Sequence, residues 1–313
     1  MSRPLTIVQQ PDFNRYSDII DVRSPGEFAE DHVPGAINLW VLNNQQRAEV
    51  GTLYKQTGQF EAKKIGAALM SRNIAYWLEN YLQDKDKDYH PLVYCWRGGQ
   101  RSEGMATILS RISWDTHLME GGYKRYRARV IQLLEKKAPK LKLKIVSGLT
   151  GSGKTLLLQR MKAHGAQVLD LEGLANHRGS LLGFDPDSPQ PQQKYFESLL
   201  ASEINQLDPQ RVTWVESESN KIGNIHCPTA LWQNMKSSPL LRLEADIADR
   251  VRFLLKDYEH FVVAPSLIKP KLKFLIQTRG HATVERWITQ LESGETSDFV
   301  EDILLNHYDI GYE

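Results

Sequence analysis

Residues that could do chemistry gather first in a short loop around a cysteine. Positions 95–101 read Cys-Trp-Arg-Gly-Gly-Gln-Arg, between an apolar run at 91–94 and a helical pattern that follows. Binding sites of open α/β sheets lie where a strand ends and a helix begins. The two glycines let backbone N–H groups turn inward, and two arginines add positive charge. We therefore predict a reactive thiolate at Cys95, with Arg97 and Arg101 as its catalytic partners.

A second loop predicts a polyphosphate site. Positions 148–155 read Gly-Leu-Thr-Gly-Ser-Gly-Lys-Thr, a complete Walker A pattern between a predicted strand at 142–147 and a predicted helix. In such loops backbone N–H groups surround the phosphates, the lysine adds a charge, and the threonine hydroxyl can bind Mg²⁺. The pattern indicates a polyphosphate without specifying a nucleotide. The predicted diphosphate-binding residues are Gly148, Gly151, Ser152, Gly153, Lys154 and Thr155, with Thr155 also as a ligand of Mg²⁺.

Carboxylates end two further predicted strands, at 167–170 and 212–216. A parallel sheet would direct them toward the phosphate loop, so we predict acid/base or metal-supporting roles for Asp170, Glu216 and Glu218. Carboxylates at strand ends are also common as plain structural residues. Polar clusters at 177–180 and 216–223 suggest a second anion site, and the predicted substrate-binding residues are His177, Arg178 and Lys221.

The length and composition fit a globular protein of two domains. The chain has 313 residues, of which 41% are hydrophobic and 25% charged, and its net charge is +1. Affinity for nucleic acid must therefore come from local patches. The two cysteines lie far apart, which argues against a disulfide scaffold and favours a reducing compartment; we read Cys227 as structural. No apolar run is long enough to span a membrane, so we expect a cytoplasmic protein with no membrane partner.

The pattern of elements predicts an α/β fold. Short apolar runs at 17–22 and 91–94 alternate with helical stretches, which is typical of a parallel sheet. A helix is predicted over 65–82, followed by a charged loop at 84–88. The acidic stretch 291–313 is predicted to be a solvated helix and tail. The residues expected on the buried side of the 65–82 helix are Ile65, Leu69, Ile74, Trp77, Leu78 and Tyr81.

Basic residues are concentrated between positions 124 and 144, where nine stand against one acid. They could form a solvated helix face with a linker, or a track for a phosphate backbone, in which each neutralised phosphate adds salt-dependent affinity. The candidate residues for binding a nucleic-acid backbone are Lys124, Arg125, Arg127, Arg129, Lys136, Lys137 and Lys140.

The first half of the chain resembles a rhodanese domain. The resemblance rests on Asp21-Val22-Arg23, Glu27-Phe28, the segment 32–38, the cysteine loop and Glu120-Gly121-Gly122-Tyr123. In that family the cysteine carries sulfur as a persulfide. Rhodaneses usually close the loop in six residues, whereas this loop has seven. That spacing also resembles rhodanese-related phosphatases, and it could equally admit a larger donor such as selenophosphate.

The whole combination resembles the tRNA 2-selenouridine synthases. The motifs at 95–102, 148–155, 177–180 and 216–219 carry this resemblance, which runs from about residue 12 to the end of the second domain. It implies a rhodanese-like parallel-sheet domain at 1–135, a basic linker at 136–144, and a P-loop NTPase-like domain with an acidic tail at 145–313. It further implies a transferase that converts wobble 2-thiouridine in tRNA to 2-selenouridine through an S-geranyl intermediate.

The same resemblance implies the substrates. Geranyl diphosphate would bind the phosphate loop with Mg²⁺, and selenophosphate, passed on from its synthase, would supply selenium that Cys95 accepts. We expect no tightly bound organic cofactor and a monomeric protein. The residues expected to line an isoprenoid trough are Leu181, Leu182, Phe184, Trp214 and Trp232.

Two rival interpretations stay open. The first is a rhodanese-type phosphatase or sulfurtransferase fused to an ATP-dependent small-molecule kinase, which would turn over ATP without RNA. The second is a nucleotide-gated binding module with an inert rhodanese fold. The intact pair of Cys95 and Arg101 speaks against the second.

Overall fold

The computed structural model describes residues 4–179, 183, 188–257 and 268–312. It divides into two compact units, one of Met1–Leu133 with Glu197–Ser202, the other of Leu134–Phe196 with Glu203–Glu313. The stretch predicted as a linker, 136–144, consists of the last residue of a helix, a 3-10 turn and the start of a strand. The predicted boundaries at 135 and 145 stay a prediction.

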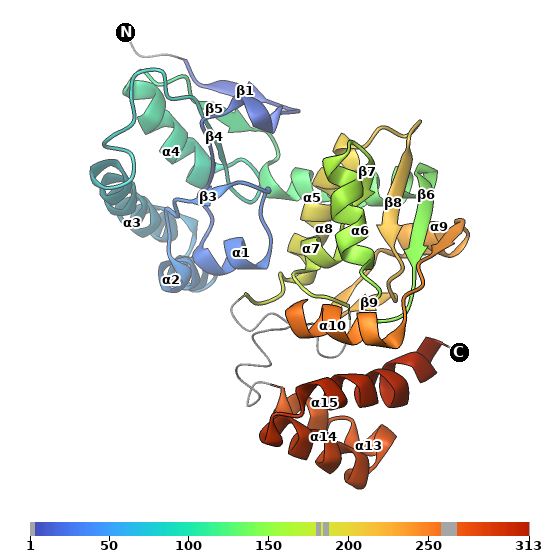
Figure 1. Ribbon diagram of the computed structural model, residues 1–313. Coiled ribbons are helices and arrows are strands. Elements are labelled where there is room, and N and C mark those ends of the chain that lie inside the picture. Colours follow the sequence, from blue (N-terminus) through green and yellow to red (C-terminus); the bar gives the residue numbers. More distant parts are fainter. Residues whose placement is uncertain (1–3, 180–182, 184–187, 258–267, 313) are drawn as a thin grey trace. The chain divides into compact units, whose positions relative to one another are not determined.

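The first unit is built on a five-stranded sheet in the order β1-β5-β4-β2-β3, and each neighbouring pair is parallel (Figure 1). The central strand, β4, is buried along its whole length, as the uninterrupted apolar run predicts for a strand covered on both faces. The strands are β1 (Thr6–Val8), β2 (Asp18–Asp21), β3 (Ile37–Asn38), β4 (Pro91–Tyr94) and β5 (His117–Met119).

Helices cover this sheet and are positioned by local signals. Ser24 and Glu27 form a capping box at α1, and Asn43 and Gln46 form one at α2. Buried side chains from the strands meet Met105 and Leu109 of α4 in one core. The helices of this unit are η1 (Phe13–Arg15), α1 (Pro25–Glu30), α2 (Asn44–Gln56), α3 (Gln59–Glu79), α4 (Gln100–Arg111) and α5 (Gly122–Lys136).

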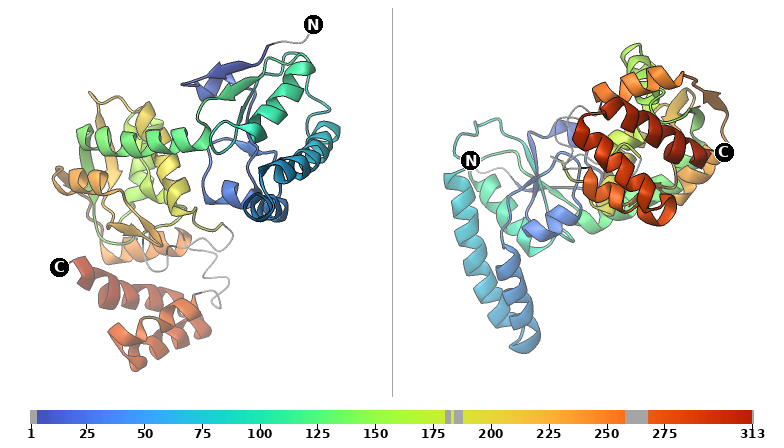
Figure 2. Two further views of the ribbon diagram at one scale, coloured as in Figure 1. Left: turned by 180° about the vertical axis from the view of Figure 1, so that it is seen from behind. Right: turned by 60° about the horizontal axis from the view of Figure 1, so that its bottom comes forward.

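Helices α2 and α3 lie side by side as a long antiparallel pair (Figure 2). The predicted helix is therefore present, although it begins six residues earlier and ends at Glu79. Ile74 is buried as expected. The prediction was wrong for Tyr81, which follows the helix, is 39% exposed and donates a hydrogen bond to Asp18.

The second unit contains a four-stranded parallel sheet in the order β11-β6-β8-β7. A two-stranded antiparallel hairpin, β9 with β10, follows the end of β8. The α/β class expected from the sequence thus holds for both units. The strands are β6 (Lys142–Ser147), β7 (Gln167–Leu169), β8 (Val212–Glu216), β9 (Lys221–Ile222), β10 (Ile225–His226) and β11 (Leu240–Arg242).

The helices of the second unit fall into two groups along the chain, one up to residue 257 and one after residue 268. In the helix at 193–206, residues 197–202 belong to the first unit. Leu158 of α6 packs with Val146 and Val168 of the sheet. The first group is η2 (Ala138–Lys140), α6 (Lys154–Ala163), α7 (Leu171–Ala175), α8 (Gln193–Gln206), α9 (Thr229–Lys236) and α10 (Ile247–Asp257). The second is α12 (Lys269–Lys273), α13 (Ile276–Arg279), α14 (His281–Ser293), α15 (Thr296–Ile303), η4 (Leu304–Tyr308) and η5 (Asp309–Tyr312).

The acidic stretch 291–313 is not the solvated tail that its composition suggested. Phe299 and Ile303 of α15 are buried with Trp287 and Leu291 of α14 in a core of their own. The acids occupy the outer face of an amphipathic helix, a pattern that a net charge count does not reveal.

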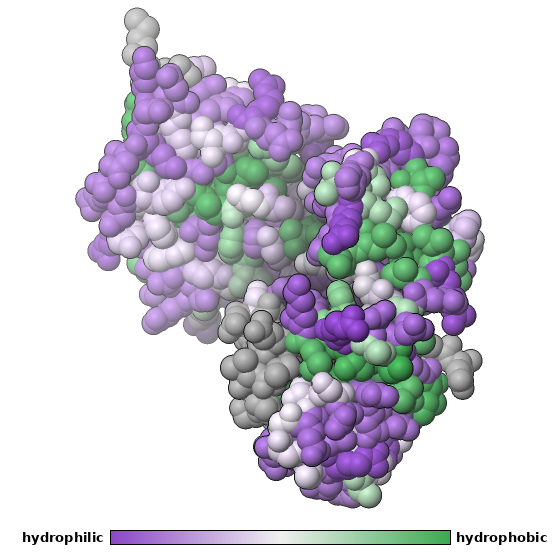
Figure 3. Space-filling view, viewed as in Figure 1, coloured by the Kyte–Doolittle hydropathy of each residue, from purple (hydrophilic) through white to green (hydrophobic). Residues whose placement is uncertain are grey.

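Hydrophilic residues cover much of the face seen in Figure 3, with smaller apolar patches between them. Among the described residues, none of the helices combines the length and the apolar character that crossing a bilayer demands.

Candidate functional site

The Cys95 loop is held in place by the first turn of α5. The N–H of Tyr123 donates to the carbonyl of Cys95 at 2.8 Å, and the N–H of Lys124 donates to that of Trp96 at 2.9 Å. Gly122 makes this approach possible, because a Cβ atom there would lie 2.3 Å from the Cys95 carbonyl oxygen, and its φ is 53°. The predicted cradle between β4 and α4 is therefore present.

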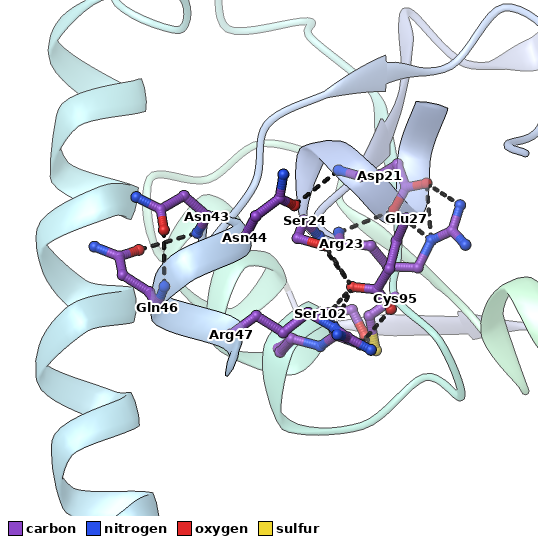
Figure 4. A network of polar contacts seen from close by, with 12 residues as sticks. Asp21, Arg23, Ser24, Glu27, Asn43, Asn44, Gln46, Arg47, Cys95 and Ser102 are labelled. Carbon is purple, nitrogen blue, oxygen red and sulfur yellow. Dashed lines mark hydrogen bonds and ion pairs between the residues drawn. The ribbon is translucent and has the colours of Figure 1, made fainter. Parts of the chain in front are cut away.

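A serine hydroxyl contacts the sulfur of Cys95. Ser102 Oγ lies 3.1 Å from Cys95 Sγ and 3.1 Å from the Gly99 carbonyl oxygen (Figure 4). Both Cys95 and Ser102 are buried. A hydroxyl that donates to sulfur stabilises the thiolate over the thiol. Ser102, which lies in the first turn of α4, was not among the predicted site residues.

Arg101 is paired with a carboxylate. Its guanidinium donates to Glu27 at 2.9 and 3.4 Å. Glu27 also accepts from Arg47 at 2.9 Å and from the Ser24 N–H at 3.1 Å (Figure 4). Burial would raise the pKa of Glu27, but the bonds and charges of these partners outweigh it, so the pKa lies below its usual value. Glu27 was quoted for the resemblance and not predicted as a site residue.

Arg97 is exposed and lines a surface hollow of about 550 Å³ with Gly121, Lys124, Arg125 and Ala128. The hollow joins one residue of the cysteine loop to two residues of the predicted basic track. It lies entirely within the first unit.

The remaining basic residues of the track have different surroundings. Arg125 pairs with Glu120 at 2.6 Å, Arg127 with Asp31 at 3.5 Å, and Arg129 donates to the Gln9 carbonyl at 2.5 Å. These arginines therefore have partners inside the protein. Lys136, Lys137 and Lys140 are exposed, and Lys137 donates to Asn205 at 2.9 Å.

The phosphate loop has the predicted strand, loop and helix around it. Lys154 opens α6, is only 8% exposed, and donates to the carbonyls of Gly148 at 3.0 Å and Leu149 at 3.4 Å. Its Nζ lies 3.6 Å from Glu216 Oε1. Thr155 Oγ1 donates to Glu216 Oε2 at 2.8 Å and lies 3.3 Å from Glu172. The structure thus brings the loop together with Glu216.

Three carboxylates converge beside Thr155. Oxygens of Glu172, Glu216 and Glu218 all lie within 4.8 Å of one another. Burial, followed by the charges of its two neighbours, raises the pKa of Glu172, and burial likewise raises the pKa values of Glu216 and Glu218. Glu172 was not predicted from the sequence, because the prediction considered carboxylates at the ends of strands and Glu172 lies on the helix α7 that follows β7.

Hard oxygen donors at such separations fit a divalent cation such as Mg²⁺. The donor set includes the Thr155 hydroxyl, which is the usual ligand in this type of loop. A cation would also remove the repulsion that raises the pKa values. The residues that would hold it are Glu172, Glu216, Glu218 and Thr155.

The other predicted residues have separate surroundings. Asp170 caps α7, since its Oδ1 accepts from the Gly173 N–H at 2.8 Å, and its predicted metal or acid/base role stays a prediction. The backbone N–H of His177 donates to the Glu172 carbonyl at 3.1 Å. Arg178 pairs with Asp257 at 2.7 Å, and Lys221 is exposed at the start of β9.

Gly179 explains why a glycine follows His177 and Arg178. Its φ is 68°, and a Cβ atom there would lie 2.4 Å from Glu218 and 2.9 Å from Glu172. Only glycine lets the backbone come this close to the carboxylates.

A hollow of about 330 Å³ lies beside the phosphate loop. Its apolar lining comes from Leu156, Leu157, Ala245 and Phe253, and its floor from residues 151–153. The predicted isoprenoid-trough residues Trp214 and Trp232 do not line this hollow, while Leu181, Leu182 and Phe184 lie outside the described residues. Cys227 is buried, which raises its pKa to about 12 and fits the structural role predicted for it.

Comparisons with known proteins assign both units. Residues 7–129 match the rhodanese-like domain, and residues 141–271 match the family described as tRNA 2-selenouridine synthase AAA domain. Curated relatives carry the name tRNA 2-selenouridine synthase. One from Shewanella denitrificans is 40% identical over 247 residues, and one from Nitrosomonas europaea is 36% identical over 244 residues.

The matched part of the chain covers 77% of its length and only 65% and 63%, respectively, of these two relatives. A relative from Cupriavidus pinatubonensis is 34% identical over 328 residues, which covers 94% of this chain and 87% of the relative. The cysteine loop falls within the first of these domain matches, and the phosphate loop falls within the second. The chain belongs to the tRNA 2-selenouridine synthase family.

Proposed function

We propose that this protein converts 2-thiouridine at the wobble position of tRNA to 2-selenouridine in two transfers. Geranyl diphosphate first alkylates the sulfur, and selenophosphate then provides the selenium that replaces the geranylated sulfur. The observation that carries the proposal is that a buried cysteine cradle and a complete phosphate loop stand together on one chain of this family.

The first transfer fits the phosphate loop. The sulfur of the base forms a bond to C1 of the geranyl group, the C1–O bond breaks, and diphosphate leaves. Lys154 and the loop N–H groups are suited to bind this leaving group. Mg²⁺ at Glu172, Glu216 and Glu218 would offset its negative charge. The base also loses its N3 proton, and Asp170, which is not one of these three carboxylates, is the proposed acceptor.

The apolar hollow beside the loop suits the isoprenoid chain. Leu156, Leu157 and Phe253 line it directly next to Gly151, Ser152 and Gly153, so a diphosphate on the loop would place its chain against apolar side chains. Its volume of about 330 Å³ is at the small end of ligand pockets. This supports a short isoprenoid over a long one.

The second transfer fits the Cys95 loop. In the net reaction the C2–S bond of the alkylated base breaks, a C2–Se bond forms, geranylthiol leaves, and water takes the phosphoryl group to give phosphate. Alkylation makes the sulfur a better leaving group. Cys95 is the expected nucleophile of this half: its sulfur forms a bond to the phosphorus of selenophosphate, the P–Se bond breaks to release selenide for C2, and water then cleaves the S–P bond to give phosphate. The Ser102 hydroxyl contacts this sulfur.

The test is mass spectrometry of nucleosides from 2-thiouridine-containing tRNA, incubated with Mg²⁺ and geranyl diphosphate, with and without selenophosphate. The variants are Cys95→Ala and Lys154→Ala, with Cys227→Ala and Lys162→Ala as matched controls for the other cysteine and for another lysine of α6. We expect geranylated uridine from all proteins except Lys154→Ala. Selenouridine should be absent from Cys95→Ala and Lys154→Ala only.

A folded wild-type protein that leaves the nucleoside pool unchanged would contradict the proposal. ATP turnover that needs Lys154 and no RNA would instead favour the kinase fusion.

A further inference from the structure

An aromatic side chain is exposed directly beside the buried nucleophile. Cys95 is 4% exposed, whereas its neighbour Trp96 is 39% exposed. Burying an indole stabilises a fold by about 1.5–3 kcal/mol or more, so an exposed one next to a reactive sulfur is a candidate contact for a ligand. The catalytic loop itself needs only its backbone at this position.

Trp96 rests on a rigid support. Its ring lies 5.3 Å from the ring of Tyr123, which is 4% exposed and donates to the carboxylate of Asp31 at 2.7 Å. The guanidinium of the buried Arg23 lies 3.9 Å from the centre of the same Tyr123 ring. The backbone carbonyl of Trp96 is fixed by the Lys124 N–H. The inner side of the indole is thus supported by the buried residues Tyr123, Arg23 and Asp31.

Positive charge adjoins this platform. Arg97 and Lys124 line the hollow of about 550 Å³ next to the loop. Within the described part of the chain neither forms an ion pair, whereas Arg125, on the same hollow, pairs with Glu120. Two cations without a carboxylate beside an exposed aromatic ring are the combination with which proteins bind single-stranded nucleic acid.

We propose that this surface binds one unstacked nucleotide of RNA, with its base on the indole of Trp96 and its phosphate at Arg97 and Lys124. The inference rests on the proposed function, because it supplies the step that brings a tRNA base to Cys95. Trp96 is then a positioning residue of the selenium transfer. Stacking depends little on the identity of the base, because every base has an aromatic face. This surface therefore orients the base, and selectivity for particular tRNAs comes from other contacts.

The test measures binding of a fluorescein-labelled anticodon stem–loop RNA by anisotropy. Stacking contributes about 1–3 kcal/mol per base, so Trp96→Ala should raise the Kd roughly tenfold. Trp96→Phe keeps an aromatic face and should stay within about threefold of wild type. Phe60→Ala removes a more exposed aromatic residue of α3, 75% exposed, and should leave the Kd unchanged.

Salt dependence tests the phosphate contact. Arg97→Ala and Lys124→Ala should each reduce the slope of log Kd against log salt by about 1 or slightly less. Arg72→Ala on α3, another exposed cation of the same unit, should not change it.

Two controls keep the outcome clear. The alkylation rate of Cys95 by iodoacetamide in Trp96→Ala should equal that of wild type, which shows that the loop is intact. Equal RNA affinity of wild type and Trp96→Ala would overturn the inference even if wild type makes selenouridine. The proposed function has a separate test: it is contradicted if the wild-type protein makes no modified nucleoside.

Discussion

The hydroxyl of Ser102 lies 3.1 Å from the sulfur of Cys95, and it is equally far from the Gly99 carbonyl. A hydroxyl has one proton, so it can donate to only one of them at a time. Ionisation of the sulfur draws that proton toward it, since hydrogen bonds to charged groups are stronger. The same side chain is therefore within hydrogen-bond distance of both the loop backbone and the sulfur.

Removing this hydroxyl should slow the chemistry of Cys95. A hydrogen bond to a charged group contributes about 1.5–3 kcal/mol, so Ser102→Ala should alkylate with iodoacetamide at pH 7 roughly tenfold more slowly. Ser110→Ala is the control, because that buried serine of α4 donates to the Thr107 carbonyl and does not contact the sulfur. Intact mass spectrometry follows the reaction, and equal rates would show that Ser102 does not act on the thiolate.

Glu27 should stabilise the first unit in a pH-dependent way. Its pKa is lowered in the folded protein, so its contribution is present above the carboxyl pKa of the unfolded chain and is lost as the pH falls through the folded value. Glu27→Gln should lower the free energy of unfolding by about 1–3 kcal/mol at pH 7. The difference from wild type should shrink in acid, which urea unfolding at pH 7 and pH 4 can measure. A difference independent of pH would contradict the assigned ion pairs.

The carboxylate cluster of Glu172, Glu216 and Glu218 should make stability depend on pH in the opposite direction. The pKa values of Glu172 and Glu218 are raised, so their share of stability is full below the unfolded carboxyl pKa and declines as the pH rises through their higher folded values. In EDTA the Tm of wild type should therefore fall toward alkaline pH relative to Glu172→Gln. Mg²⁺ should raise the Tm of wild type at pH 8 and that of Glu172→Gln much less. No Mg²⁺ response in wild type would argue against a cation site here.

The apolar hollow should set the length of the isoprenoid. Phe253→Ala enlarges it and should move the preference from geranyl toward farnesyl diphosphate, by several-fold in kcat/KM, as one missing methylene already changes discrimination by about 1–3 kcal/mol. Trp232→Ala is the control, since Trp232 does not line this hollow. Transfer assays with the two diphosphates on 2-thiouridine-containing tRNA would measure the ratio. An unchanged ratio in Phe253→Ala would place the chain elsewhere.

The sequence predicted those parts of the protein that rest on local pattern. Apolar runs predicted β4 and β6, and the glycine spacing predicted both cradles, because strand and loop signals lie within a few residues of each other. Glu172, Ser102 and the partner of Arg101 could not be predicted in the same way. Their roles arise from side chains that the fold brings together, such as Glu27 and Arg101. The amphipathic face of α15 was hidden by its net charge.

One more long-range contact concerns the acidic end of the described chain. Arg250 of α10, only 3% exposed, donates to the Thr150 carbonyl of the phosphate loop at 2.8 Å and to both carboxylate oxygens of Asp309 at 2.6 and 2.9 Å. A Leu254 methyl group lies against Gly151 of the same loop. Arg250 thus links the phosphate loop to Asp309.

By thermodynamic linkage, ligand binding at the phosphate loop and the Arg250–Asp309 contact should affect each other equally. A diphosphate that orders the loop should slow hydrogen exchange in η5, and loss of the Asp309 carboxylate should weaken diphosphate binding by the same free energy. What reads in the sequence as an acidic periphery is joined, through one guanidinium, to the backbone of the phosphate loop.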